Sequence, residues 1–327
     1  MSNFSKIFSN GTFVVNLSKS IKLQNTLNYK SFIFPGGEEH IKLLPDVHKL
    51  KKVNKFILAS SMENSSEIMK MLMATDSLKS LYPNKKIELF SPYYPYARQD
   101  RIMMKGEPFS LKVISKIINM QKYDKIHILD PHSDVTPALV DNVNVINNVD
   151  FINLVWNDIT KNNSFVKNFC IVSPDAGAEK KLQNIVSKLQ IESKNIIKAS
   201  KIRNVTNGNI IKTDFVGDVN GKVCLIYDDI IDGGTTFVEL AKKLKEKGAL
   251  RIYLAVSHGI FSKGLDELKK YCDRIYTTDS FPSPHSDNSK EKLYSNTNHS
   301  QKVYPFNLVK QLDFIKIIPI HDFYSLE

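Results

Sequence analysis

Short apolar runs bounded by polar segments recur along the chain and predict buried strands. Runs of this length without alternating polar positions are typical of strands that are covered on both faces of a parallel sheet. The runs are Phe56–Ala59, Ile87–Phe90, Ile126–Leu129, Cys170–Val172, Val223–Tyr227 and Ile252–Val256.

Amphipathic segments between these runs predict helices. Helical spacing relates Ile68, Leu72, Thr75 and Leu78, and then Leu111, Ile114, Ile117 and Ile118. We interpret the methionines Met69, Met71 and Met73 as core packing of the first of these helices. Strands that alternate with helices predict an α/β fold, in which mostly parallel sheets are flanked by helices.

The start and the end of one helix can be predicted from the sequence alone. The i, i+3, i+4, i+7 pattern of a buried helical face fits Phe237, Leu240, Ala241 and Leu244. Gly248 supplies a C-cap, and the helix therefore begins at Gly234–Thr236.

Length and composition fit a cytoplasmic protein of two domains. The chain has 327 residues, of which 42% are hydrophobic, and a chain of this size usually forms two domains. Cys170, Cys224 and Cys272 have no zinc-ligand spacing and indicate a reducing compartment. The N-terminus lacks a signal-peptide pattern, and no apolar run approaches the roughly 18 residues of a membrane span. We therefore expect no membrane partner.

The formal net charge of +11 favours anionic partners. Lysines are interleaved with acids along helical patterns, as in Ala241–Lys247, which is typical of a solvated helix face. No nucleic-acid-binding module is recognised, so we expect no nucleic-acid partner. A basic nucleic-acid-binding α/β protein is an alternative, and a salt-sensitive gel shift would be its minimum support.

Two polar segments directly follow predicted strands and point to phosphate chemistry. Ser91–Arg101 places clustered cations after Ile87–Phe90, and ligands of open α/β sheets bind beyond the carboxyl ends of the strands. Asp228–Thr236 follows Val223–Tyr227 and joins paired carboxylates to a Gly/Thr segment at a helix start. The acids suit ribose hydroxyls, and the backbone N–H groups of such a turn suit a phosphate.

Together these segments resemble the ribose-phosphate pyrophosphokinase family, also called phosphoribosyl pyrophosphate synthetases. The second segment alone would indicate only the wider phosphoribosyltransferase group. Other matching pieces occur in the family's order between about Phe32 and Thr278: Phe34–Glu38, Asp130–Ser133, Val172–Gly177 and Ser257–Ser262. The resemblance implies two phosphoribosyltransferase-like domains with the active site between them, and we place these domains at residues 1–145 and 146–327.

The resemblance also implies the reaction. The β,γ-pyrophosphoryl group of ATP moves to the C1 hydroxyl of ribose 5-phosphate, which gives phosphoribosyl pyrophosphate and AMP. Phosphoryl-type transfer is catalysed mostly by positioning and charge neutralisation, so we expect cations, Mg²⁺ and two phosphate-binding surfaces. A homo-oligomer is expected as well.

For ATP, Arg98 and Gln99 match the family's nucleotide-contacting pair, and Arg98 can hold phosphate with its planar guanidinium. Phe34 and Glu38 match positions that contact adenine, although Phe34 could instead be a buried strand residue. Gly36 departs from the Asp or Asn usual in the family, so one base contact is missing.

For magnesium, His132 and Asp175 match the family's metal-proximal residues, and His132 is also expected to contribute to catalysis. Asp130 is expected to orient neighbouring groups rather than to bind metal. Mg²⁺ keeps several waters and takes oxygens of the substrate phosphates, so few protein ligands are expected.

For ribose 5-phosphate, Asp228 and Asp229 match residues near the ribose hydroxyls and the metal. The segment that matches the 5-phosphate loop consists of Asp232, Gly233, Gly234, Thr235 and Thr236. It reads Asp-Gly-Gly-Thr-Thr rather than the commoner Asp-Thr-Ala-Gly-Thr, but its backbone donors remain available, so phosphate binding should survive.

Lys201 and Arg203 match the catalytic Lys-x-Arg of the family's flexible loop. The spacing from this pair to Val216–Asp218 differs by about one residue from relatives, so Lys198 is a competing assignment, and a solvated loop charge is a further one. Lys201 is favoured because it retains an arginine two residues later.

The chain departs from the family near both ends and in its regulatory stretch. Residues 281–302 are rich in Ser, Asn, Pro and Lys and predict a long loop, followed by the apolar run Phe314–Ile320 in place of the usual final helix. The segment before Phe32 lacks a convincing first helix. Asp134–Leu139 matches the family's allosteric stretch poorly, so phosphate activation and ADP inhibition are not carried over.

Two further functions share parts of this pattern. A phosphoribosyltransferase would need Asp228–Thr236 but neither the Arg98–Gln99 segment nor a second α/β half. A non-catalytic regulatory homologue would keep the fold and lose catalytic residues. Retention of His132, Arg98, Gln99, Lys201 and Arg203 argues against the regulatory homologue.

Overall fold

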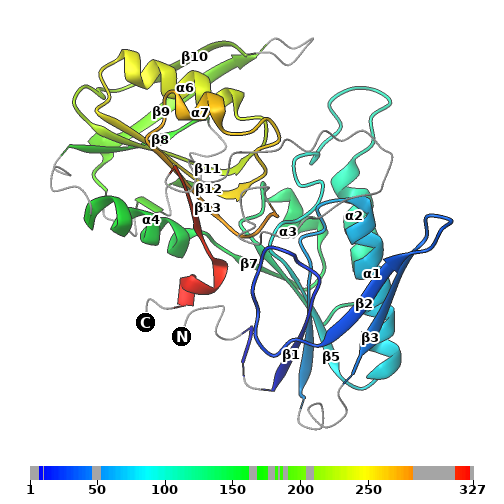
Figure 1. Cartoon of the computed structure of the whole chain (residues 1–327). Coiled ribbons are helices and arrows are strands. Elements are labelled where there is room, and N and C mark those ends of the chain that lie inside the picture. Colours follow the sequence, from blue (N-terminus) through cyan, green and yellow to red (C-terminus); the bar gives the residue numbers. More distant parts are fainter. Residues whose placement is uncertain are drawn as a thin grey trace. The chain divides into compact units, whose positions relative to one another are not determined.

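The computed structural model describes residues 7–9, 11–45, 53–161, 168–175, 181–182, 185–186, 191–203, 210–282 and 314–324. For residues 200–203, 210–213, 323 and 324 the description covers the backbone. The chain forms two compact units (Figure 1). One contains Met1–Asn157 with Pro319–Glu327, and the other contains Asp158–Ile318. The predicted domain boundary at residue 145 stays a prediction.

The first unit is built on a five-stranded sheet in the order β1-β4-β5-β6-β7. All neighbouring strands in it are parallel, as predicted. The strands are β1 (Thr12–Asn16), β4 (Lys55–Ala59), β5 (Lys86–Ser91), β6 (Lys125–Leu129) and β7 (Val143–Ile146). The helices of this unit are α1 (Ser65–Leu81), α2 (Ser110–Asn119) and α3 (Val135–Leu139). A separate antiparallel hairpin joins β2 (Asn28–Ile33) to β3 (Glu39–Leu44).

The predicted apolar faces of α1 and α2 form the core of the first unit. Its buried residues include Phe56, Leu58, Met71, Leu78, Leu89, Leu111, Ile118 and Ile126. The interpretation of the methionines was wrong for Met69, whose side chain is exposed, whereas Met71 is buried and Met73 packs against the core. Ile68, Met71 and Leu78 lie on the buried face of the helix, and Met69 lies outside that face.

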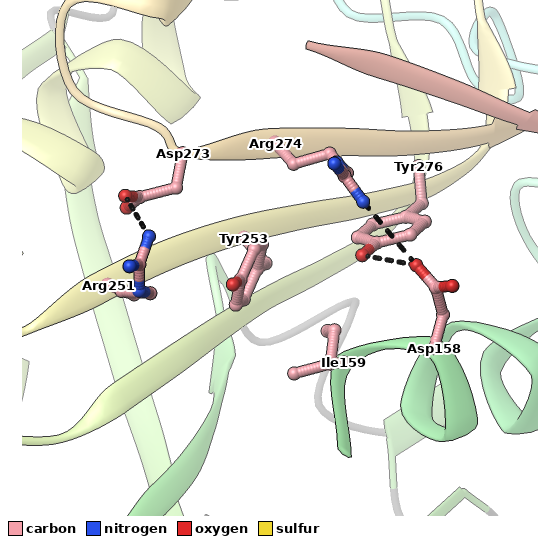
Figure 2. Close-up of a pocket in the computed structure, with 7 residues that line it drawn as sticks. All are labelled: Asp158, Ile159, Arg251, Tyr253, Asp273, Arg274 and Tyr276. Carbon is pink, nitrogen blue, oxygen red and sulfur yellow. Dashed lines mark hydrogen bonds and ion pairs between the residues drawn. The ribbon is translucent and has the colours of Figure 1, made fainter. Parts of the chain in front are cut away.

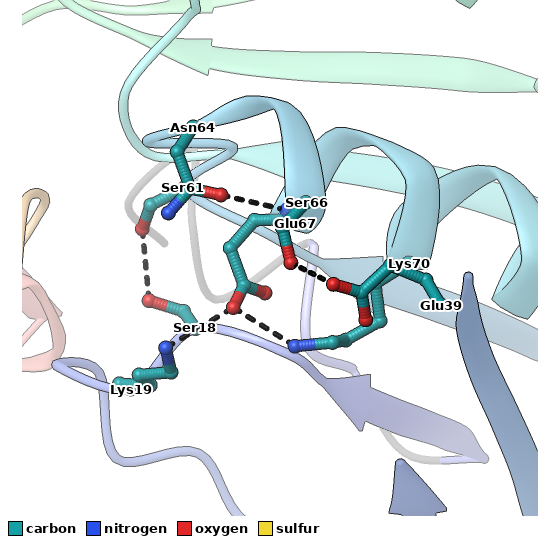
Figure 3. A network of polar contacts seen from close by, with 8 residues as sticks. All are labelled: Ser18, Lys19, Glu39, Ser61, Asn64, Ser66, Glu67 and Lys70. Atoms are coloured by element: carbon teal, nitrogen blue, oxygen red, sulfur yellow. Dashed lines mark hydrogen bonds and ion pairs between the residues drawn. The ribbon is translucent and has the colours of Figure 1, made fainter. Parts of the chain in front are cut away.

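A polar network fixes the N-terminus of α1 (Figure 3). Asn64 Oδ1 accepts a hydrogen bond from the backbone N–H of Glu67 at 3.0 Å, which caps the helix. The buried carboxylate of Glu67 pairs with Lys19 at 3.1 Å, and Ser66 Oγ donates to Glu39 Oε1. Because Lys19 follows β1 and Glu39 begins β3, these contacts join the helix start to the first strand and to the hairpin.

The second unit contains a seven-stranded sheet in the order β10-β9-β8-β11-β12-β13-β14. Its neighbours are parallel except for β9 and β10, which are antiparallel. The strands are β8 (Phe169–Ser173), β9 (Ile196–Arg203), β10 (Ile210–Val216), β11 (Val223–Ile231), β12 (Arg251–Gly259), β13 (Arg274–Thr278) and β14 (Ile315–Ile318). The two units together confirm the predicted α/β class.

Helices and turns complete the second unit. They are α6 (Thr235–Glu246), α7 (Asp266–Lys269) and the 3₁₀ turn η2 (Ser193–Asn195), while α4 (Val149–Lys161) spans the division between the units and η4 (Ile320–Tyr324) follows β14. The prediction for α6 is confirmed: it begins after Gly234 (φ +75°), and Gly248 (φ +88°) follows its last turn. Its predicted apolar face belongs to the core of the second unit, whose buried residues include Leu240, Leu244, Ile252, Leu254 and Ile275.

Other predictions for the chain ends have mixed outcomes. Residues 283–302 of the predicted loop lie outside the described residues. Residues 314–324 hold β14 and η4, and the expected loss of a final helix stays a prediction. Among the described residues, no helix is long and apolar enough to cross a membrane. The three cysteines are buried and free of disulfides.

Candidate functional site

In the first unit, the carboxyl ends of two adjacent strands bring predicted site residues together. β5 and β6 are parallel, with Ser91 opposite Ile128, so the segments that follow them emerge at one edge of the sheet. A hollow of about 620 Å³ at this edge is lined by Arg98, Gln99, Asp100, Arg101, Met103, Glu107, Pro108, Ser110 and His132. Arg98, Gln99 and His132 therefore share one concave surface, although His132 lies 33 positions after Gln99 in the sequence.

Backbone hydrogen bonds hold the walls of this hollow. Gln99 N donates to Tyr96 O at 2.9 Å, and Leu111 N of α2 donates to Gln99 O at 3.2 Å. Asp130, which follows β6, has a positive φ of +39°, an uncommon conformation for a residue other than glycine. The buried carboxylate of Asp130 accepts a hydrogen bond from Asn148 Nδ2 at 2.6 Å. That contact holds the side chain of Asp130 in place two residues before His132, and its orienting role stays a prediction.

Arg101 is a residue of the hollow that the sequence-based assignment omitted. Its Nε donates to Asp100 Oδ1 at 2.9 Å. Burial alone would raise the pKa of Asp100, but the hydrogen bond and positive charge of Arg101 outweigh burial and lower that pKa. The hollow therefore contains an ionised acid beside its arginines, and Arg101 could have been assigned from its place in the cation cluster Ser91–Arg101.

Phe34 and Glu38 do not line this hollow. They lie in the turn of the β2–β3 hairpin, where Phe34 N donates to Glu38 O and Gly37 N donates to Phe34 O, both at 2.8 Å. The ring of Phe34 is 43% exposed and contacts the ring of Phe32 edge-on at 4.9 Å between centroids. The alternative of a buried strand residue is therefore wrong, because the hairpin turn holds the ring in solvent.

In the second unit, the predicted acid pair lies within β11 rather than after it. The strand extends to Ile231 because its pairing with β12 continues, with Ile230 opposite His258. Asp228 Oδ1 accepts a hydrogen bond from Asp229 N at 2.9 Å, and Lys181 lies 3.7 Å from the carboxylate of Asp229.

The electrostatics of this acid pair would favour a bound cation. Burial, the charge of Asp229 and the charge of Asp175 raise the pKa of Asp228 well above its ordinary value. Asp175 follows β8, the strand beside β11, and its backbone O accepts a hydrogen bond from Ser173 Oγ at 2.7 Å. A bound divalent cation would relieve the mutual repulsion, and hard carboxylate oxygens suit Mg²⁺. No cluster of three or more His, Cys, Asp or Glu residues with metal-binding geometry occurs in the described parts of the chain.

The predicted phosphate loop forms the start of α6. Gly234 precedes the helix, so the positive end of the helix dipole faces the segment from Asp232 to Thr236. A methyl group added at Gly233 would lie 3.4 Å from both Cδ and Cε of Lys263, so that lysine lies along the loop. Lys263 follows β12, the neighbour of β11, and has no ion pair among the described residues. The sequence assignment omitted Lys263, although it directly follows the matching piece Ser257–Ser262.

Lys201 and Arg203 lie at the end of β9, in the hairpin that β9 forms with β10. Lys201 is opposite Thr213, and Arg203 is opposite Ile210. Residues 204–209 between the two strands lie outside the described residues. The competing Lys198 lies three residues earlier on β9, opposite Ser173 of β8, and its side chain is exposed.

Two family models match the chain, one in each half. The N-terminal domain of ribose phosphate pyrophosphokinase matches residues 6–121, and the phosphoribosyl synthetase-associated domain matches residues 173–293.

Curated relatives match most of the chain. The ribose-phosphate pyrophosphokinase of Corynebacterium glutamicum is 30% identical over 254 residues, which cover 76% of this chain and 75% of the relative. That of Mycoplasmopsis pulmonis is 32% identical over 252 residues, with the same coverage of 76% and 75%. That of Pyrococcus furiosus is 27% identical and covers 77% of this chain and 85% of its own.

A solved structure shares the fold. The crystal structure of phosphoribosylpyrophosphate synthetase from Mycobacterium smegmatis superposes with a TM-score of 0.71 and covers 95% of both chains at 19% identity. At this identity the match shows a common fold, and the sequence relatives carry the family assignment.

Proposed function

This chain belongs to the ribose-phosphate pyrophosphokinase family, and we propose that it transfers the pyrophosphoryl group of Mg-ATP to the C1 hydroxyl of ribose 5-phosphate, with release of AMP. The observation that carries this assignment is that both units contain candidate phosphate-binding residues. The first unit has a hollow with Arg98, Gln99 and His132, and the second has an acid pair before a helix N-terminus. Two separate phosphate-binding surfaces suit a reaction between two phosphorylated substrates.

We assign the triphosphate of ATP to the hollow of the first unit. Arg98 and Arg101 supply planar guanidinium groups, which hold phosphate oxygens through paired N–H donors. Gln99 and His132 add donors beside them. Phe34 and Glu38 contact adenine from the hairpin turn, where the exposed ring of Phe34 offers an apolar face to the base.

We assign ribose 5-phosphate to the second unit. Asp228 and Asp229 accept hydrogen bonds from the ribose hydroxyls, and residues 232–236 bind the 5-phosphate through backbone N–H groups and the hydroxyls of Thr235 and Thr236. Asp175 and His132 contact the ion. Mg²⁺, when bound, neutralises oxygens of the triphosphate. Lys201 and Arg203 stabilise the charge of the group in transfer.

The two alternatives need fewer of these features. A phosphoribosyltransferase would use the second unit alone and would leave the grouping of Arg98, Gln99 and His132 without a role. A regulatory homologue is not favoured, because the acid pair, the matching phosphate-loop segment and the hollow with Arg98, Gln99 and His132 are all present. A cytoplasmic homo-oligomer is part of the proposal, and sedimentation of the purified protein tests its assembly.

A coupled assay tests the activity directly. We expect AMP to form only when Mg²⁺, ATP and ribose 5-phosphate are all present. AMP formation that does not depend on the sugar, or the absence of product across a range of metal and phosphate concentrations, would overturn the assignment.

Gly36 should make the enzyme less selective for adenine. A side chain added at Gly36 meets no atom within 4 Å, and its backbone is not in the left-handed region, so Gly36→Asp should fold normally. The new carboxylate can bond one edge of the base, and we expect it to raise the ratio of kcat/KM for ATP over GTP about tenfold, since one such bond contributes about 1.5 kcal/mol. An unchanged ratio in an active variant would show that Glu38 and main-chain groups already select the base.

Lys263 should strengthen binding of the 5-phosphate. Its aliphatic chain runs over Gly233, which places its ammonium group near the phosphate loop. We expect Lys263→Met to raise KM for ribose 5-phosphate about tenfold while kcat and KM for ATP change little, because a ground-state contact to a charged group contributes about 1.5 kcal/mol. Lys242→Met, on the exposed side of α6, is the control and should have no effect. If both substitutions raised KM for ribose 5-phosphate equally, Lys263 would act only through the overall charge of the protein and not through a contact with the phosphate.

A further inference from the structure

A second concave site lies in the second unit, at the opposite end of the strands from the phosphate loop (Figure 2). Arg251 is the first residue of β12 and Arg274 is the first residue of β13, whereas Lys263 and the 232–236 loop follow carboxyl ends. The pocket has a volume of about 350 Å³, within the usual range for small-ligand sites. Its lining consists of Asp158, Ile159, Arg251, Tyr253, Asp273, Arg274 and Tyr276.

Strand alternation and register build this pocket. Ile252, Leu254 and Ile275 face the core beneath α6, so the residues between them point to the other face of the sheet. Arg251 and Tyr253 thus lie on one face of β12, and Tyr253 is opposite Arg274 of β13. The end of α4 covers this face, where Tyr276 Oη donates to Asp158 Oδ2 at 2.9 Å.

Two arginines and two aspartates line the pocket, and Lys245 and Lys316 just outside this lining add the excess of positive charge. The carboxylate of Asp273 lies 3.3 Å from Arg251 and 3.5 Å from Lys245. The carboxylate of Asp158 lies 3.6 Å from Arg274 and 2.6 Å from Lys316. Among the described residues, each of these two aspartates therefore forms ion pairs with two cationic side chains. The arginines stay accessible, with side chains 51% exposed at Arg251 and 36% exposed at Arg274.

We propose that this pocket binds a small inorganic polyanion of the pyrophosphate class. The excess of cations selects for negative charge, and guanidinium groups match phosphate oxygens in geometry. The rings of Tyr253 and Tyr276 are only 8% and 1% exposed, so the pocket offers little aromatic surface for a nucleobase. An inorganic ion therefore fits the site better than a nucleotide.

The only tryptophan of the chain supplies a local readout. Trp156 lies in α4, two residues before Asp158. Titration of the purified full chain with pyrophosphate should change the fluorescence of Trp156 in a saturable way. Arg251→Gln should weaken this binding about tenfold, and Arg274→Gln should weaken it similarly. Both variants should keep the wild-type KM for ATP and for ribose 5-phosphate.

Two further variants separate this site from the candidate active site and from a structural role. Arg98→Gln makes the same chemical change in the hollow of the first unit and should leave the fluorescence titration unchanged. Asp273→Asn removes one negative charge but keeps an oxygen that can accept from Ile252 N, so pyrophosphate should bind several-fold more tightly. Loss of the signal in Arg98→Gln, or unaltered binding in both Arg251→Gln and Asp273→Asn, would overturn the proposal. Tighter binding of AMP than of pyrophosphate at the Arg251-dependent site would overturn the inorganic assignment.

Discussion

Lys201→Ala should lower kcat by about 10²–10³-fold while each KM stays within about threefold of its wild-type value. A cation that acts mainly on the transferring group stabilises the transition state more than the bound substrates, so its loss appears in turnover. Steady-state kinetics with ATP and ribose 5-phosphate varied in turn measure both effects. Arg203, two residues away on β9, should show the same pattern with a smaller loss.

Lys198→Ala is the matched control for this prediction. Lys198 lies on the same strand, beside β8, and its side chain is exposed. We expect it to retain most of the wild-type kcat. A large loss in Lys198→Ala together with a mild effect of Lys201→Ala would transfer the catalytic role to Lys198.

Asp228→Asn should stabilise the free protein and nearly abolish its activity. Partial burial, together with the charges of Asp229 and Asp175, raises the pKa of Asp228, so the ionised carboxylate is unfavourable in the folded protein. An amide of the same shape removes the repulsion and should increase the free energy of unfolding by about 0.5–2 kcal/mol, as is common for substitutions in destabilised active sites. The rate should fall by about 10²-fold or more, because the ribose hydroxyls and the ion lose a charged partner.

The stabilisation should depend on pH in a defined direction. The raised pKa means that folded Asp228 holds its proton at pH values where the unfolded chain has lost it, so its contribution to stability is complete below about pH 4 and is lost as the pH rises. The advantage of Asp228→Asn should therefore be small at pH 4 and grow towards pH 7. Denaturant unfolding at several pH values, without Mg²⁺ or substrates, measures it. Asp141→Asn, an exposed Asp of the first unit, should give no such trend, and a trend common to both variants would refute this account.

Central strands were predictable from sequence because burial on both faces leaves uninterrupted apolar runs. The predicted runs correspond to β4, β5, β6, β8, β11 and β12, which lie inside the two sheets. Strands nearer the sheet edges were not predicted. β9 mixes polar and apolar residues, a pattern that resembles a loop, and β14 lies within the apolar run Phe314–Ile320, which was not assigned to a strand.

The candidate site was predictable where a short motif follows a central strand. Arg98, Gln99 and His132 meet in one hollow, and Gly234 begins α6 as expected. Lys263 was missed because its contact with Gly233 depends on which strands are neighbours. The pair Arg251 and Arg274 was missed for the same reason, since strand register alone brings residues so distant in sequence together.

The pairing of β14 with β13 also bears on how the protein folds. Thr278 lies opposite Ile318 although residues 279–314 separate the two strands in the chain. Closing a longer connection adds little cost in free energy, roughly 0.6 kcal/mol for each doubling of its length, but contacts between distant residues form slowly. The last strand should therefore dock after the rest of its sheet has assembled, and this connection is where the gene could lengthen with little penalty to the finished fold.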